Sequence, residues 1–121
     1  PTIRTPHLDK LAGQGLRFPR GYVPTSLCRA SLATMVTGLY PHQHLITSND
    51  PPLPPGVKPG GGKDHPDIIR QRREMADLFA KSETLAERLG KAGYVSFQAG
   101  KWWEGNACRC GGFTAGMTEG D

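Results

Sequence analysis

The chain has 121 residues, which is about the length of one small domain. Its net charge of +4 suits an anionic substrate but is too mild to indicate a nucleic-acid partner. No apolar run approaches the length of a membrane span. The 16 glycines and 11 prolines indicate long loops in a folded domain rather than disorder.

The first predicted element is a short helix that begins after Thr5. Thr5 is a good N-cap and Pro6 a good first helical residue, while Gly13 or Gly15 can end the helix. Residues 16–18 then alternate apolar and polar side chains, which predicts a short strand. The proline that follows confines this strand to the edge of a sheet.

Cys28 stands where a polar turn enters a predicted helix over residues 30–37. The helix has small and apolar residues on every side, which is typical of a buried helix, so Cys28 is expected at the floor of a site. Unpaired backbone N–H groups and the helix dipole attract anions at such an entrance. The position therefore combines a nucleophile with an anion cradle; the alternative is a buried, inert cysteine.

The middle of the chain predicts a long loop and then a helix. Residues 45–65 contain runs of proline and glycine that cannot hold a regular element for long. A helix is predicted over residues 66–80, because Ile68, Met75 and Phe79 fall on one apolar stripe.

Another helix is predicted after Thr84, which forms a capping box with Glu87. Three residues are expected on its buried face: Leu85, Leu89 and Ala92. Alternation over residues 94–99 predicts a strand, and residues 100–121 are expected to form a glycine-rich loop. The order of these elements predicts an α/β fold with a sheet layered by helices.

Cys108 and Cys110 lie one residue apart in the predicted C-terminal loop. A metal site would need further cysteine or histidine ligands at suitable spacing, and none follows in the sequence. We therefore expect exposed thiols; the alternative, a disulfide between them, would be strained.

Three sequence blocks follow one another along the chain. The first spans residues 5–18, and the second contains Ser26-Leu-Cys-Arg-Ala-Ser-Leu32. The third begins with the helix after Thr84 and ends in Gly100-Lys-Trp-Trp103. In this order, the blocks resemble the N-terminal part of the type I, formylglycine-dependent sulfatases.

The resemblance implies an α/β fold in which this chain is a fragment of an alkaline-phosphatase-like mixed sheet layered by helices, with long Pro/Gly-rich loops. Residues 1–121 would be part of the N-terminal catalytic domain, without its upstream first strand and its downstream half. Residues 45–65 would be a loop insertion between two family blocks. A periplasmic or secreted location is suggested by the resemblance alone.

The resemblance also implies a sulfuric ester hydrolase that acts on a sulfated small molecule or carbohydrate. The cysteine at the position of Cys28 is oxidised by the formylglycine-generating enzyme, and the hydrated aldehyde attacks the sulfur of the ester. Ca²⁺ assists as a Lewis acid, and modified Cys28 would be its one ligand from this chain, which alone lacks a complete active site. Lys101 would contact the sulfate group.

Four further residues are expected to bind substrate: Arg29, Ser31, His42 and Trp103. The family pattern Cys-x-Pro-Ser-Arg is matched only in part, because Ala30 replaces the proline and Leu32 the arginine. Trp103 stands where the family has a histidine.

These departures keep two alternatives open. One is a phosphoester or phosphodiester hydrolase of the same superfamily with an unmodified Cys28. The other is a catalytically inactive, sulfatase-like protein that retains the anion pocket.

Overall fold

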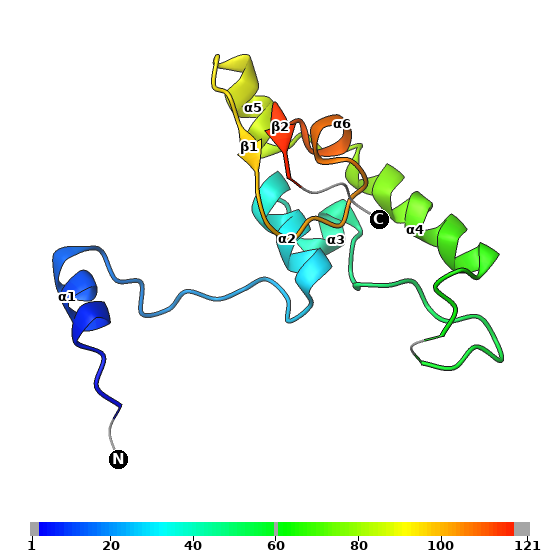
Figure 1. Cartoon of the computed structure of the whole chain (residues 1–121), viewed down its shortest axis with the longest axis horizontal. Helices are drawn as coiled ribbons and strands as arrows, with labels where there is room; N and C mark the ends of the chain where they lie inside the picture. The colour runs from blue at the N-terminus through cyan, green and yellow to red at the C-terminus, as the bar shows by residue number, and fades with distance from the viewer. Residues whose placement is uncertain (1–2, 60, 118–121) are drawn as a thin grey trace.

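The structure is a computed structural model that describes residues 3–59 and 61–117 (Figure 1). Its elements, in chain order, are α1 (Pro6–Gln14), α2 (Cys28–Thr37), α3 (Pro41–His44), α4 (Pro66–Phe79), α5 (Leu85–Lys91), β1 (Phe97–Gln98), α6 (Ala107–Gly111) and β2 (Ala115–Gly116). Within the described ranges, none of the helices has the length and apolarity needed to cross a bilayer.

The sheet consists of two parallel strands. Phe97 of β1 pairs with Ala115 of β2, and Gln98 pairs with Gly116. Parallel neighbours need a crossover connection, which here contains α6. The α/β class is therefore confirmed. The described residues do not form the large layered sheet, so the alkaline-phosphatase-like arrangement stays a prediction.

The hydrophobic core joins α2 and α4. Ala33, Ile46 and Phe79 are buried together, and Trp102 and Met75 are among the partly buried residues packed against them. Helix α2 starts at Cys28, two residues before the predicted start, and ends at Thr37, followed by the C-cap Gly38 in the left-handed conformation with φ 71°. Helix α4 confirms the prediction over residues 66–80 to within one residue.

The capping box at the start of α5 is confirmed. The Thr84 hydroxyl accepts from the Glu87 N–H at 3.1 Å, and the Glu87 carboxylate accepts from the Thr84 N–H at 2.8 Å. The Thr84 hydroxyl also donates to the Gly111 carbonyl at 2.7 Å, which attaches α5 to α6. The predicted buried face is wrong: in this orientation Ala86 is buried, whereas Leu85 is 56% exposed.

Three other predictions need correction. Residues 16–18 are exposed and unpaired, so no strand forms there. The strand expected over residues 94–99 is reduced to β1, and the Tyr94 N–H bonds to Leu89 at the end of α5 instead of joining a strand. Of the loop expected over residues 100–121, residues 100–117 include α6, which the Asn106 side chain caps, and β2, which pairs with β1; residues 118–121 lie outside the described residues. The loop prediction holds for the described part of residues 45–65, which contains no helix or strand.

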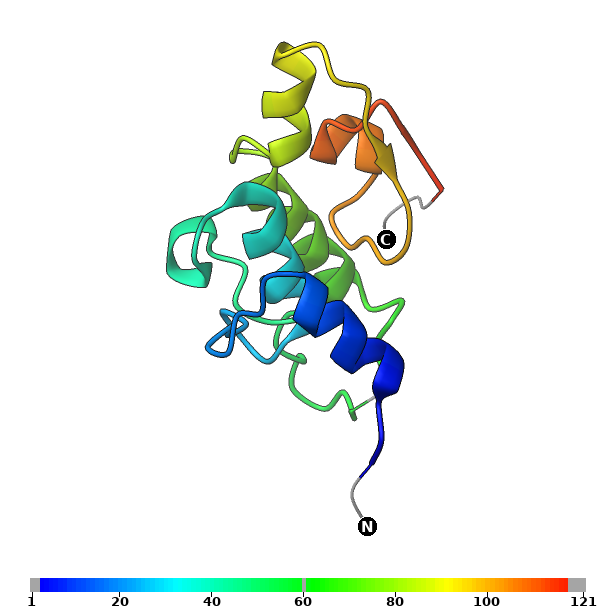
Figure 2. The same cartoon turned by 90° about the vertical axis from the view of Figure 1, so that its left-hand side faces the viewer.

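The elements are unevenly distributed in space. A long extended segment separates α1 from α2, and no residue of α1 is buried. Helices α5 and α6 and both strands gather at one end of the molecule in the two views (Figure 1, Figure 2). The structure that can position a site therefore begins at α2.

We expect Phe79→Ala to lower the free energy of unfolding by about 3 kcal/mol, because it leaves a cavity at the centre of the core. Urea unfolding followed by circular dichroism measures this change. The matched control is Met35→Ala on α2, whose side chain is 64% exposed, and it should stay within about 0.5 kcal/mol of wild type. Equal effects of the two substitutions would contradict this assignment of the core.

Candidate functional site

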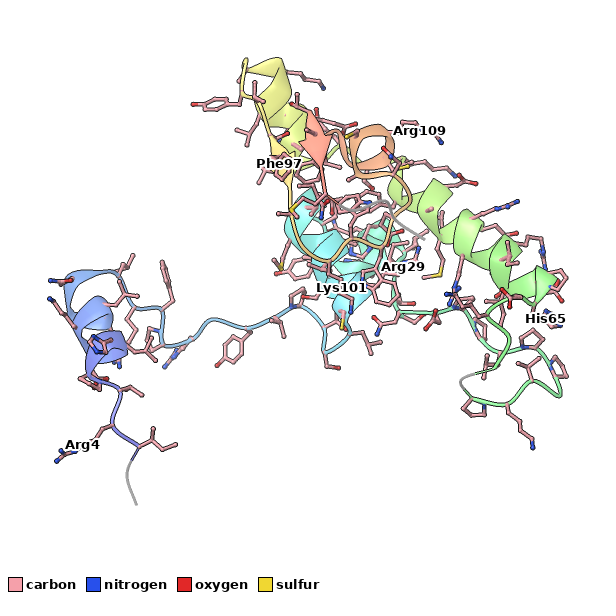
Figure 3. The ribbon with its side chains drawn as sticks, viewed as in Figure 1. Arg4, Arg29, His65, Phe97, Lys101 and Arg109 are labelled. Atoms are coloured by element: carbon pink, nitrogen blue, oxygen red, sulfur yellow. The ribbon has the colours of Figure 1, made fainter. Side chains whose placement is uncertain are left out.

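A cavity of about 210 Å³ lies between α2 and the loop that follows β1. Three of the predicted site residues line it: Arg29 from α2, and Lys101 and Trp103 from the loop. Leu32 and Phe97 contribute apolar walls. Figure 3 labels Lys101 and Arg29 in the region where the loop passes α2, and both residues line the cavity. The structure thus brings the second and third sequence blocks together.

The loop is directed toward α2 by a turn and an aromatic anchor. Gly100 has φ 93°, a left-handed conformation that favours glycine, directly before Lys101. Trp102 then packs edge-on between the rings of Phe79 and Phe113, at centroid distances of 5.7 and 5.5 Å. Gly111 permits this packing, because a Cβ there would lie 2.6 Å from the Trp102 ring.

A buried ion pair connects α2 to the same loop. Arg29 Nε donates to Glu104 Oε1 at 2.6 Å, and Nη2 donates to Oε2 at 2.7 Å. The two side chains are only 3% and 5% exposed. Two parallel charge-assisted bonds of this kind fix the relative orientation of the two groups. The Arg29 guanidinium was predicted to bind substrate, but here it is engaged by Glu104; a substrate contact stays a prediction.

Sequence reasoning missed two residues of this arrangement. Glu104 is one, and Asn49 is the other, because its Oδ1 accepts from the Arg29 N–H at 2.9 Å. This bond occupies one of the N–H groups that the predicted anion cradle would use. A lone carboxylate directly after two tryptophans was the available signal for Glu104, since such a group is rarely buried without a cation.

Lys101 and Trp103 form a cation–π contact. Lys101 Nζ lies 4.6 Å from the centroid of the Trp103 ring, within the range of this interaction. Lys101 is exposed and Trp103 is half-buried. The ammonium group is thereby held beside the cavity that both residues line.

The other predicted site residues lie outside this cavity. Cys28 is exposed as the first residue of α2, so it is not at the floor of a pocket as expected. Helix α2 is only partly buried, which explains the difference. Ser31 is half-buried within the first turn, and His42 is exposed and stacks on the Tyr40 ring at 5.9 Å.

A second histidine, His44, is buried behind α2. Its Nδ1 accepts from the Ile46 N–H at 3.0 Å, so Nε2 carries the proton and donates to Thr34 Oγ1, also at 3.0 Å. Burial lowers the pKa of His44, and the negative charge of Glu104 partly offsets this shift. The imidazole is therefore a neutral structural group.

The described residues offer no ligand set for a metal ion. No group of three or more histidine, cysteine, aspartate or glutamate side chains gathers anywhere in residues 3–59 and 61–117. Cys108 and Cys110 are free thiols in α6: Cys108 is exposed, as expected, whereas Cys110 is half-buried, and neither belongs to such a group.

Comparisons with known proteins place this geometry in context. The family model for the sulfatases matches residues 1–119. Arylsulfatase A from Bos taurus is 36% identical over 102 residues, which cover 84% of this chain and 16% of that protein. N-acetylgalactosamine-6-sulfatase from Homo sapiens is 34% identical over 108 residues, covering 88% and 18% respectively.

A bacterial relative, the N-acetylgalactosamine-6-O-sulfatase from Bacteroides thetaiotaomicron, is 30% identical over 100 residues, which cover 83% of this chain and 16% of that protein. The chain thus spans less than a fifth of the length of these relatives. No solved structure matches the chain significantly.

We expect Glu104→Gln to lower the free energy of unfolding by about 3 kcal/mol, because it leaves the Arg29 charge buried without a counter-charge. Urea unfolding at neutral pH measures the change. Glu83→Gln is the matched control: it removes an exposed carboxylate paired with Arg88 and Lys91, and it should have a much smaller effect. Equal losses in the free energy of unfolding would show that the buried pair stabilises the fold no more than the exposed pair does.

The pH dependence of stability should report the burial of His44. Below about pH 6.5 the unfolded chain binds a proton at this histidine, while the folded chain resists protonation because its pKa is lowered. The free energy of unfolding should therefore fall as the pH drops through this value, and level off below the folded pKa.

Urea unfolding measures this dependence between about pH 8 and pH 5, the range in which histidine ordinarily titrates. His44→Gln should flatten it, whereas His42→Gln, which replaces an exposed ring, should retain it. An unchanged slope in His44→Gln would contradict the assignment.

Proposed function

This chain belongs to the sulfatase family, and on that premise we propose that the protein hydrolyses sulfate esters. The observation that carries the proposal is that the family match runs through both the block of Cys28 and the block of Lys101. The cavity between those two blocks supports it, because it combines a cation with apolar walls. A sulfated small molecule or carbohydrate has the matching composition: one anionic group on a larger, less polar body.

We assign the precursor of the nucleophile to Cys28. Its exposed position in the first turn of α2 leaves the thiol open to a modifying enzyme, in agreement with conversion by the formylglycine-generating enzyme. The modified side chain would supply an oxygen nucleophile for attack at sulfur.

Lys101 is assigned to bind the sulfate group. An ammonium group is a compact charge with three N–H donors, and it suits a tetrahedral oxyanion. None of the ion pairs among the described residues involves Lys101, so its charge is available to a ligand. Ser31 and His42 are retained as proposed substrate contacts, although neither lines the cavity.

Ca²⁺ is part of the proposal, with Cys28, after its conversion to formylglycine, as its one ligand among the described residues. The described part of the chain does not fit a metal site, because its carboxylate, histidine and cysteine groups do not gather. The chemistry proposed for this chain is therefore limited to Cys28, Lys101 and the cavity that Lys101 lines.

Two departures from the family pattern favour a second candidate function. Ala30 is fully buried, and Leu32 lines the cavity where the family has an arginine. The second candidate is therefore a phosphoester or phosphodiester hydrolase with an unmodified Cys28. A protein that binds anions without hydrolysis is the other alternative. The experiment must distinguish both from a sulfatase.

The experiment is mass spectrometry of the peptide that carries Cys28, from protein made in its natural host, together with assays on 4-nitrophenyl sulfate and bis(4-nitrophenyl) phosphate. An aldehyde with sulfate-ester hydrolysis supports the proposal. An intact thiol with phosphodiester hydrolysis supports the second function, and an intact thiol without hydrolysis supports a binding protein.

Removal of the nucleophile gives the matching prediction. Cys28→Ala should lower the rate of sulfate-ester hydrolysis by at least about a thousandfold. Cys108→Ala, which removes another exposed thiol, is the control and should retain the wild-type rate. Full activity in Cys28→Ala would exclude this residue as the source of the nucleophile.

A further inference from the structure

We propose that Trp103 is a positioning residue for Lys101, because its indole face holds the ammonium group beside the cavity where an anionic ester group binds. The inference deepens the proposed function and rests on it, since Lys101 is the group assigned to the sulfate. The proposed role of Trp103 requires the face of an aromatic ring, because that face is what attracts the Lys101 ammonium group.

The geometry supports a specific electrostatic contact. Lys101 Nζ lies 4.6 Å from the ring centroid, and the negative face of an indole attracts a cation at this distance. A lysine side chain has many rotamers, so an exposed ammonium group is otherwise poorly localised. The ring restricts these rotamers, while the N–H donors that point away from it stay available to an oxyanion.

The carboxylate nearest in sequence does not compete for Lys101. Glu104 lies three residues further along the same loop, but both its oxygens accept bonds from the buried Arg29 guanidinium. A free carboxylate on this loop would attract the ammonium group more strongly than a ring does. The ion pair of Arg29 therefore leaves Trp103 as the group that holds Lys101.

The polar atom of the indole does not explain the presence of a tryptophan. Trp103 Nε1 is buried and has no hydrogen-bond partner among the described residues. A buried donor without a partner is unfavourable, so the ring is not held in place by this N–H. Phenylalanine would retain an aromatic face without the unpaired donor, whereas leucine would retain only apolar bulk.

The test compares Trp103→Leu with Trp103→Phe in the full protein. The measurements are kcat and KM for 4-nitrophenyl sulfate, the dissociation constant of inorganic sulfate by calorimetry, and the melting temperature. Trp103→Leu should raise KM and the sulfate dissociation constant about two- to fivefold, the equivalent of one exposed cation–π contact, with a smaller change in kcat. Trp103→Phe should restore most of the affinity.

A double-mutant cycle with Lys101→Met separates positioning from space filling. In the Lys101→Met background, Trp103→Leu should cause no further loss of sulfate affinity, because the contact is already absent. The same loss in both backgrounds, or equal affinities of the Leu and Phe variants, would overturn the proposal even where both variants fold.

Failure of the proposed function gives a different result. A wild-type protein that hydrolyses no sulfate ester, but whose sulfate affinity falls in Trp103→Leu and recovers in Trp103→Phe, would overturn the hydrolase and retain the positioning role. A wild-type protein that binds no inorganic sulfate would overturn the positioning role as well.

Discussion

The buried ion pair between Arg29 and Glu104 is the constraint on which the candidate site depends. Removing two charges from water is unfavourable by several kcal/mol for each ion, and good geometry is needed to compensate for it. The pair meets this condition with two short parallel bonds. Because those bonds tolerate little displacement, they specify where the loop after β1 lies against α2. Trp102, packed between two aromatic rings on the same loop, reinforces that position.

The ion pair also determines which charges remain for a ligand. Arg29 and Glu104 neutralise each other, although both line the cavity. Lys101 is the remaining cation among the residues that line it, and its contact is with an aromatic ring rather than a carboxylate. One buried contact therefore positions the loop and, by engaging Glu104, leaves the charge of Lys101 available. Of the two residues expected to contact the substrate, Arg29 is therefore neutralised by Glu104, whereas Lys101 keeps an unneutralised charge.

Local sequence signals predicted the elements that depend on neighbouring residues. The capping box of Thr84 and the apolar stripe of α4 are confirmed, because their determinants lie within a few residues of each other. The buried face of α5 was mispredicted, since it depends on contacts with distant residues; the bond from Thr84 to Gly111, 27 residues away, is one of them. The partner of Arg29 lies 75 residues away and left no periodic signal. The resemblance to a family, rather than any pattern of spacing, associated Lys101 with the block of Cys28.

The single positive charge that Lys101 brings to the cavity suits some of the proposed esters better than others. A sulfate monoester carries one negative charge, whereas a phosphate monoester carries about 1.5 to 2 near neutral pH. A single unpaired ammonium group balances the first but not the second. Leu32 adds no second cation to this balance, although the family pattern has an arginine at its position. A phosphodiester carries the same single charge as a sulfate ester, so among phosphate compounds it is the one that this charge balance also suits.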